Sequence, residues 1–368
     1  MHKSLLLTLL FPLQVLPGMA QSAIRMVVGT YTDGTSRPRP TGRGIYSFVF
    51  DPVKGIAHAL DTLNISNPSY LTISQDGSRI YAVSENSDST AAVNAIRFDS
   101  RTGKMQLINS QSTKGADPCY VSTNGRILLT ANYSGGSLSV FPLDKDGALL
   151  PMSQQIKGTT TASDMPQQST AHIHCAQFTP GGQEVLATDF SANRIIRMTL
   201  HQGTSLSSPT TAALLPKNSG CRHFVWSNDN KYCYVISELS GAVTVLQNAP
   251  GLMPVVQQIQ SDSVGGHGSA DIHLSPDGRF LYTTNRLVND GISIFTVDKV
   301  SGKLNKIGYQ PTGTHPRNFN ITPNGRFLLC ACRDSGVIQV FLIDSASGLL
   351  HDTHQDIKID KPVCIQFF

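Results

Sequence analysis

The sequence repeats with a period of about 48 residues, and this repeat restricts the possible folds more than any other feature. Each repeat holds an apolar strand, a tight turn rich in Asp, Asn and Gly, and a second apolar strand. Alternating β-branched residues between such turns are typical of β-hairpins. The turns lie at Asp76-Gly77, Asn124-Gly125, Gly181-Gly182, Asp229-Asn230, Asp277-Gly278 and Asn324-Gly325, at intervals of 48, 57, 48, 48 and 47 residues.

The pieces left outside the repeat indicate how the fold closes. Each repeat continues into a third strand, as in GGSLSVFPL or GISIFTV, and six turns give six complete modules. The N-terminal RMVVGTYTDG…RGIYSFVFDPVKG and the C-terminal KPVCIQFF remain. A unit that pairs strands from both chain ends closes a ring and removes the open sheet edge. The sequence therefore predicts an all-β fold, a seven-bladed β-propeller closed by N- and C-terminal strands in one blade; a solenoid would instead need capping repeats.

Composition agrees with one large all-β domain. The 368 residues include 31 Gly and 20 Pro, and only 15% are charged. The cysteines are odd in number and lie mostly in apolar runs, and the CAC at 330–332 lacks the C-x-x-C spacing of zinc and redox sites. We expect buried thiols with at most one disulfide among Cys119, Cys175, Cys221, Cys233, Cys330, Cys332 and Cys364.

Residues 1–20, MHKSLLLTLLFPLQVLPGMA, have the features of a secretory signal peptide: Lys3, an apolar run, and small residues before Gln21. A membrane anchor fits less well, because the run is shorter than the roughly 20 residues of a bilayer span and contains two prolines. We predict that residues 21–368 form a single propeller domain that is exported to the periplasm without membrane association, or is cytoplasmic if the segment stays uncleaved. Without Lys3 the chain has 28 basic and 25 acidic residues, which does not indicate a nucleic-acid partner.

The repeat also predicts which side chains meet at one rim of the ring, because the first strand of each blade lies nearest the axis. In a hairpin, the start of the first strand and the end of the second strand both lie opposite the turn, and so both lie on the same rim. Counting seven residues back from each turn gives Ser69, Asp117, His174, Arg222, Ala270 and Arg317, although the shorter second module can shift Asp117 out of register. Counting nine residues forward gives Glu85, Tyr133, Phe190, Glu238, Arg286 and Arg333.

One rim of a protein with few charges thus collects imidazoles, guanidinium groups and carboxylates. The period-two alternation of a strand adds His172 to the face of His174, and it pairs Asp271 with His273. Such groups could simply be structural, since Arg–Glu pairs can join neighbouring blades and a strand histidine is often a satisfied core residue. Their convergence on a concave site is also typical of active sites. The excess of arginine argues against a metal and favours an anionic ligand.

Several motifs, in order and in register, resemble the seven-bladed lactonases that include the propeller-type 6-phosphogluconolactonases and the fungal carboxy-cis,cis-muconate lactonizing enzymes. The resemblance covers nearly all of residues 21–368. It is carried by VGTYT, NPSYL, YAVSEN, ANYSGGSLSVF, HIHCAQFTPGGQ, CRHFVWSNDNKYCYVISEL, ADIHLSPDGRFLYTTNR and HPRNFNITPNGRFLL. Two segments depart from the family pattern: the usual G-P-R-H reads Gly220-Cys221-Arg222-His223, and the usual D-L-G-x-D reads Asp189-Phe190-Ser191-Ala192-Asn193.

The resemblance implies a catalytic cleft and an activity. It implies hydrolysis of a sugar lactone without a cofactor, with 6-phosphogluconolactone of the pentose phosphate pathway as the substrate. Glu238 or His174 would act as the base, and Arg286 and Arg222 would stabilise the oxyanion. Together with the rim positions, it gives His172, His223, Asp271, Asn285, Arg317 and Glu85 as substrate-binding candidates.

Three alternatives stay open at this point. An exported enzyme would meet unphosphorylated lactones more readily than a phosphorylated metabolite. A cyclising isomerase of the muconate-lactonizing type could use the same arginines to hold carboxylates. A non-catalytic ligand-binding propeller would share the fold. The expected partner is a small anionic lactone, and the sequence leaves open whether the protein is a monomer or a dimer.

Overall fold

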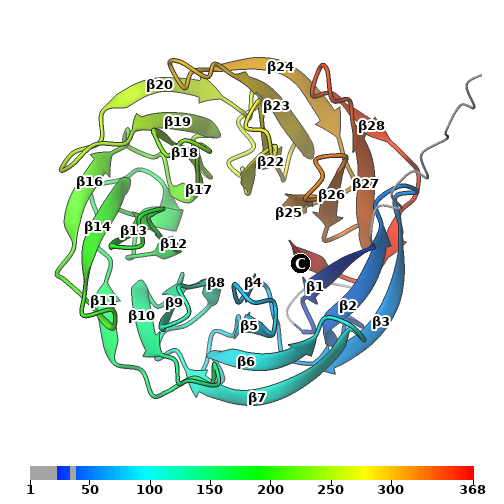
Figure 1. Cartoon of the computed structure of the whole chain (residues 1–368). Helices are drawn as coiled ribbons and strands as arrows, with labels where there is room; N and C mark the ends of the chain where they lie inside the picture. The colour runs from blue at the N-terminus through cyan, green and yellow to red at the C-terminus, as the bar shows by residue number, and fades with distance from the viewer. Residues whose placement is uncertain (1–22, 34–38) are drawn as a thin grey trace, which may run out of the picture.

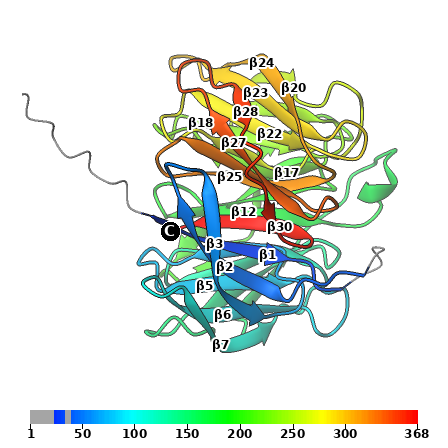
Figure 2. The same ribbon diagram turned by 90° about the vertical axis from the view of Figure 1, so that its right-hand side faces the viewer.

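In the computed structural model, seven antiparallel sheets are arranged as blades around a central axis (Figure 1). The structure describes residues 23–33 and 39–368, so the predicted signal peptide lies outside the described residues. A strand from each end of the described chain meets in one sheet: the C-terminal β30 (Pro362–Phe367) pairs with β1 (Ile24–Thr30), and the two lie side by side in Figure 2. The predicted seven-bladed propeller and its closure are confirmed.

Within each blade the strands follow one another from the axis outward. Blade 1 contains β30, β1, β2 (Gly44–Asp51) and β3 (Ile56–Asn64). Blade 2 contains β4 (Leu71–Ile73), β5 (Arg79–Ser84), β6 (Ala92–Asp99) and β7 (Lys104–Ser112). Blade 3 contains β8 (Pro118–Thr123), β9 (Ile127–Asn132), β10 (Ser137–Pro142) and β11 (Gln154–Lys157). Blade 4 contains β12 (Ile173–Phe178), β13 (Glu184–Asp189) and β14 (Arg194–His201), which pairs with both β15 (Ser205–Leu206) and β16 (Thr210–Leu214).

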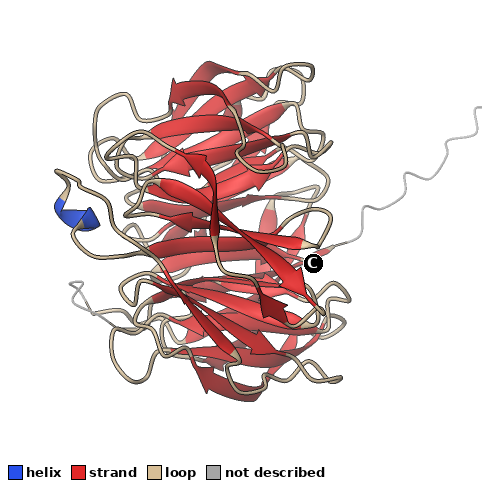
Figure 3. Cartoon of the chain, turned by 90° about the vertical axis from the view of Figure 1, so that its left-hand side faces the viewer, coloured by secondary structure: helices blue, strands red, loops and turns tan. Residues whose placement is uncertain are grey.

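The last three blades follow the same plan. Blade 5 contains β17 (Cys221–Trp226), β18 (Tyr232–Ser237), β19 (Ala242–Gln247) and β20 (Val255–Gln260). Blade 6 contains β21 (Ile272–Leu274), β22 (Phe280–Asn285), β23 (Gly291–Val297) and β24 (Leu304–Pro311). Blade 7 contains β25 (Pro316–Ile321), β26 (Phe327–Cys332) and β27 (Val337–Ile343), which pairs with β28 (Leu350–Asp352) and β29 (Ile357–Lys358). A short 3-10 helix, η1 (Pro166–Gln168), stands out from the ring between blades 3 and 4 (Figure 3).

The repeated turns join the first two strands of blades 2 to 7, and blade 6 shows why their sequence is so regular. The Ser275 hydroxyl donates to the Asp277 carboxylate at 2.6 Å and accepts from the Phe280 backbone at 3.0 Å. Gly278 has a φ of +68°, a conformation that favours glycine. Such a turn therefore combines a polar residue, an Asp or Asn, and a residue at positive φ. This combination can be recognised in the sequence.

The hydrophobic core lies between adjacent blades. Phe50 of blade 1 packs edge-on against Phe327 of blade 7 with ring centroids 5.7 Å apart, and Ile338 and Val340 belong to the same buried cluster. All seven cysteines lie in the described part of the chain as buried free thiols, which confirms that expectation. Because each blade needs both neighbours to bury its two faces, the ring holds its inner strands in fixed positions.

Candidate active site

Bulges near the start of the inner strands aim side chains toward one rim of the ring. In β8, β12, β17 and β25 the pairing with the second strand shifts at corresponding places. A bulge leaves a residue out of the ladder and redirects its side chain. The residues at these bulges include Cys119, His174, Arg222 and Arg317. Cys119 takes the place that counting assigned to Asp117, which lies in the loop before β8 with a φ of +51°.

The second strands end on the same rim. Glu85, Tyr133, Glu238, Arg286 and Arg333 each follow directly after a second strand, namely β5, β9, β18, β22 and β26. The two counts from the turns therefore lead to one place, as predicted. We call His174, Arg222, Glu238, Arg286, Arg317 and Glu85 the rim cluster.

Glu238 lies at the centre of the rim cluster. Its Oε2 accepts a hydrogen bond from Arg222 Nε at 2.8 Å, and its Oε1 lies 3.3 Å from Arg286 Nη2. Burial raises the pKa of Glu238, but the charges of Arg286, Arg222 and Arg317 outweigh burial and hold it below its ordinary value. The side chain of Glu238 is 22% exposed, against 3% for Arg222 and 5% for Arg286. Glu238 is therefore an ionised group that a small molecule can reach.

Backbone carbonyls fix both arginines. Arg222 Nη1 donates to the Ala270 carbonyl at 2.7 Å, and Arg286 Nε donates to the Gly268 carbonyl at 2.7 Å. Burial lowers the pKa of Arg286 and Glu238 opposes this, so its guanidinium stays charged at neutral pH. Two rigid cations thus flank one carboxylate, an arrangement able to bind a developing negative charge.

Arg317 and Glu85 form a second ion pair of the rim cluster. Arg317 Nη2 lies 3.4 Å from Glu85 Oε1, which also accepts a hydrogen bond from the Tyr31 hydroxyl at 2.9 Å. The Arg317 guanidinium lies over the Tyr31 ring, 5.5 Å from its centroid. The second oxygen of Glu85, Oε2, is buried and has no hydrogen-bond partner among the described residues. Glu85 therefore keeps an unused hydrogen-bond acceptor beside Arg317.

The two histidines of blade 4 differ in what they offer. His172 stacks on Tyr133 with ring centroids 4.1 Å apart, and its Nδ1 and Nε2 face the Tyr133 carbonyl at 2.7 Å and the Thr170 hydroxyl at 3.3 Å. His174 is buried, and burial, followed by the charges of Arg222, His223 and Arg317, lowers its pKa well below the ordinary value. His174 is therefore neutral at pH 7, while His172 is largely occupied by its neighbours.

Three of the predicted substrate-binding side chains, His223, Asp271 and Asn285, are hydrogen-bonded to other protein groups. His223 Nδ1 bonds Asp271 Oδ1 at 2.8 Å, and the Asp271 carboxylate also contacts His273 Nε2 at 3.1 Å and the Asn318 amide. The Asn285 amide is buried and meets the hydroxyls of Ser261, Ser269 and Ser293. In this structure Asp271 and Asn285 contact protein groups, and neither side chain is brought to the rim cluster.

Sequence reasoning missed two residues of the rim. Tyr31 comes from the segment after β1, which has no counterpart in the repeat. His315 Nε2 lies 3.1 Å from Arg286 Nη1. A signal for His315 existed, because it precedes Arg317 by two residues, as His172 precedes His174.

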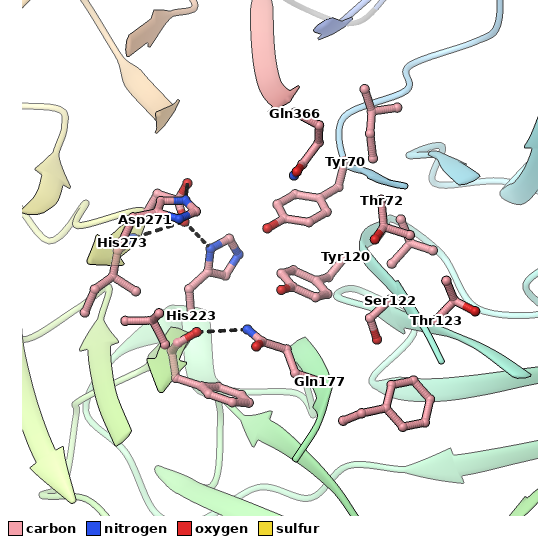
Figure 4. A pocket seen from close by; sticks show the side chains of 16 residues that line it. Tyr70, Thr72, Tyr120, Ser122, Thr123, Gln177, His223, Asp271, His273 and Gln366 are labelled. Carbon is pink, nitrogen blue, oxygen red and sulfur yellow. Dashed lines mark hydrogen bonds and ion pairs between the residues drawn. The ribbon is translucent and has the colours of Figure 1, made fainter. Parts of the chain in front are cut away.

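A cavity of about 820 Å³ opens beside Glu85 on the same rim. Its lining is richer in carboxylates than in cations: Asp33, Glu85, Asp88 and Asp117 against Arg333, which is already paired with Asp334 at 2.8 Å. A second cavity of about 380 Å³ is lined by the inner strands farther from the rim cluster (Figure 4). Of the rim cluster, Glu85 lines the larger of these two cavities.

Fold and site together define a seven-bladed propeller with an arginine-rich acid–base cluster at one rim. The family model described as "Lactonase, 7-bladed beta-propeller" matches residues 25–367. The chain belongs to this family of seven-bladed β-propeller lactonases.

Named relatives agree with this assignment. A curated 6-phosphogluconolactonase of Formosa agariphila is 34% identical over 355 residues, covering 93% of this chain and 99% of the relative. A solved Bacteroides uniformis protein, provisionally assigned as a 6-phosphogluconolactonase, is 51% identical with a TM-score of 0.89, covering 95% of this chain and 100% of that one. The periplasmic gluconolactonase PpgL of Pseudomonas aeruginosa is 31% identical with a TM-score of 0.86, covering 94% and 99%.

The described residues contain no helix that is both long and apolar enough to cross a membrane. Across residues 23–33 and 39–368, no group of three or more His, Cys, Asp or Glu side chains is arranged to hold a metal ion.

Proposed function

We propose that the protein hydrolyses a sugar lactone, most simply 6-phosphogluconolactone to 6-phosphogluconate. The observation that carries this proposal is the accessible Glu238 carboxylate held between two buried guanidinium groups, Arg222 and Arg286. Hydrolysis of an ester needs a base for water and positive charge where the oxyanion develops. Relatives named 6-phosphogluconolactonase, similar over almost their whole length, support the same activity.

In the proposed mechanism Glu238 takes a proton from a water molecule as the water oxygen attacks the lactone carbonyl carbon. The carbonyl oxygen becomes negative and is stabilised by Arg222 and Arg286. The negative charge that develops beside these fixed cations offsets part of their effect on the carboxylate, so the basicity of Glu238 rises during the reaction. When the tetrahedral intermediate collapses, the ring C–O bond breaks. The leaving alkoxide then takes up the proton that Glu238 removed from water.

His174 suits the role of base less well than Glu238. It is 5% exposed, and a proton on its ring would lie among Arg222 and Arg317. A neutral imidazole can instead accept a hydrogen bond from a substrate hydroxyl. Arg317 and the unpartnered Oε2 of Glu85 are the proposed contacts for the polar tail of the substrate.

Two features of the structure bear on the substrate tail, the part of the substrate beyond the lactone ring. Arg317 would bind a phosphate, whereas the carboxylates around the neighbouring cavity would favour an uncharged tail. The relative PpgL is described as a periplasmic gluconolactonase. We propose export to the periplasm for this chain on the basis of its N-terminal sequence.

The test is acid release from freshly prepared 6-phosphogluconolactone and from glucono-δ-lactone, each corrected for spontaneous hydrolysis. Faster hydrolysis of either lactone would support the proposal. The ratio of the two kcat/KM values shows whether the enzyme prefers a phosphorylated or an unphosphorylated substrate tail. Supplying the open-chain acid and looking for ring closure tests cyclisation in the same assay. Acceleration of neither lactone would contradict the proposed function.

The catalysed rate is expected to show no acid limb near pH 6.5. The active form has Glu238 deprotonated, and the guanidinium groups hold its pKa below the ordinary carboxyl value, so activity is retained as pH falls through neutrality. It is lost only below about pH 4.5, when the carboxylate takes up a proton. Background-corrected kcat/KM measured between about pH 4 and 7 checks this, and a limb centred near 6.5 would point to an imidazole base instead.

Chelation is expected to leave the activity unchanged. The proposed mechanism uses Arg222 and Arg286 where a metal-dependent hydrolase would use a Lewis acid. The measurement is the rate before and after incubation with EDTA and removal of the chelator. A loss of activity that zinc or calcium restores would contradict the mechanism.

A further inference from the structure

The side chains of the inner strands form layers below the rim cluster. The residues that follow the bulge positions make a second layer: Tyr70, Tyr120, Cys175, His223, Asp271, Asn318 and Cys364. Two residues further along each strand lies a third layer, which contains Thr72, Ser122, Gln177, Val225, His273, Asn320 and Gln366. Since alternate residues of a strand share a face, both layers face the axis, and the third layer lies farther from the rim cluster than the second. Charge is dense at the rim, whereas the third layer has no Lys, Arg, Asp or Glu.

Aromatic rings separate the rim cluster from the third layer. Tyr70 stacks on Tyr120 with centroids 4.2 Å apart, and both rings meet His223 edge-on at 5.7 and 5.2 Å. His223 in turn contacts His174 of the rim cluster, with centroids 5.1 Å apart. All four side chains are at least nine-tenths buried. The space below these rings is therefore distinct from the cleft at the rim.

That space is the cavity of about 380 Å³ shown in Figure 4, within the range of roughly 300–1,000 Å³ that small-molecule sites occupy. The phenol hydroxyls of Tyr70 and Tyr120 point into it, toward His223. The Tyr120 hydroxyl also has the Tyr70 hydroxyl and the Cys175 thiol as close polar neighbours. A phenol hydroxyl both donates and accepts hydrogen bonds, so each can contact a polar ligand that enters the cavity.

Other polar groups of the lining are already used between blades. The Gln177 amide nitrogen donates to the Phe224 carbonyl at 2.8 Å, and the Ser122 hydroxyl donates to the Ala176 carbonyl at 2.8 Å. These bonds hold neighbouring inner strands together and fix the walls. The one carboxylate of the lining, Asp271, is occupied by hydrogen bonds with His223 and His273. The cavity thus presents fixed hydroxyl and amide groups with no cation for an anionic ligand.

We propose that this cavity is a second ligand site, for an uncharged, hydroxyl-rich molecule of monosaccharide size. Such a ligand both donates and accepts hydrogen bonds, and it can therefore use the two phenols and the amide oxygen of Gln177. It carries no charge that would need a partner in a wall without Lys or Arg. The site is independent of the lactone cleft, because the aromatic rings lie between them.

The experiment measures binding without turnover. Isothermal titration calorimetry is carried out on the full-length protein with D-glucose, with myo-inositol, and with glucuronate as an anionic probe of similar size. We expect saturable binding of a neutral probe and at least about tenfold weaker binding of glucuronate. Changing Tyr70→Phe and Tyr120→Phe together keeps the rings and is expected to weaken binding about tenfold or more, through loss of two hydrogen bonds.

Glu238→Gln is the matched variant for the cleft. Binding of the neutral probe is expected to be unaffected by it, which separates this site from the proposed lactone site whether or not lactonase activity is found. The proposal is overturned if neither neutral probe binds saturably, if the double Tyr→Phe variant binds as the wild type does, or if Glu238→Gln abolishes binding. A far-UV circular dichroism spectrum like that of the wild type shows that the double variant is folded.

Discussion

Changing Glu238 to Gln is expected to lower kcat/KM for lactone hydrolysis by about 100- to 10,000-fold, the range of a lost general base. The amide cannot accept the proton of water, and it no longer balances the charges of Arg222 and Arg286. The substrate can still reach the guanidinium groups, so the loss falls on kcat more than on KM. Background-corrected initial rates on 6-phosphogluconolactone and glucono-δ-lactone measure both constants.

A matched control is Glu184→Gln on β13. Glu184 also pairs with an arginine, Arg197, at 3.5 Å, but it lies away from the rim cluster. This change is expected to leave the activity unchanged. Because Glu238→Gln leaves two buried cations with a weaker partner, Glu238→Asp provides a second variant that keeps the charge and moves it back by one methylene. Full activity in both Glu238 variants would contradict the assigned base.

The period of the sequence was sufficient to predict the ring and its closure. Each turn is specified locally, as the Ser275, Asp277 and Gly278 contacts show, so the turns mark equivalent points in successive blades. Equivalent points converge at one rim, and this is why counting found Glu238, Arg222, Arg286 and Arg317 without knowledge of their contacts. The same count failed at Asp117, because the segment before the Asn124-Gly125 turn is shorter than in the other blades. The bulge in β8 therefore falls at Cys119.

Side-chain partners could not be predicted in this way. Asn285 is the last residue of β22 and directly precedes Arg286, yet its amide is held by serines inside the blade, because successive residues of an extended chain face opposite sides. Tyr31 belongs to a segment outside the repeat, and it reaches Glu85 only through the closing blade. Register predicts which backbone positions meet, whereas hydrogen bonds decide which side chains remain free for a ligand.

The Asp271 carboxylate illustrates the difference between a binding group and a group that holds the site together. It accepts hydrogen bonds from the Ile272 backbone at 3.0 Å and from His223 at 2.8 Å, and it also meets His273 and Asn318. These partners come from blades 5, 6 and 7. By holding Nδ1 of His223, it turns Nε2 toward Arg222 Nη1, 3.4 Å away. Asp271 thus connects three inner strands and supports the guanidinium beside Glu238.

Changing Asp271 to Ala is expected to lower the free energy of unfolding by about 3–5 kcal/mol, because buried donors of His223, Asn318 and the Ile272 backbone lose their shared acceptor, at roughly 1–3 kcal/mol for each. The side chain is 2% exposed, so water cannot replace it at His223 or Asn318. Urea unfolding, followed by the fluorescence of the single Trp226, measures the change. Asp277→Ala is the control: its ion pair with Arg279 is on the surface, and such pairs contribute about 1 kcal/mol or less.

The effect of Asp271→Ala is also expected to depend on pH in one direction. Burial raises the pKa of Asp271, but His273 and His223 outweigh burial and depress it far below the ordinary carboxyl value. A depressed pKa stabilises the folded state above the unfolded pKa of about 4, and this stabilisation is lost as pH falls toward the folded value. The difference between the wild type and Asp271→Ala should therefore be full at pH 7 and decrease below about pH 4. Equal losses for Asp271→Ala and Asp277→Ala at pH 7 would mean that the three inner strands do not depend on this carboxylate.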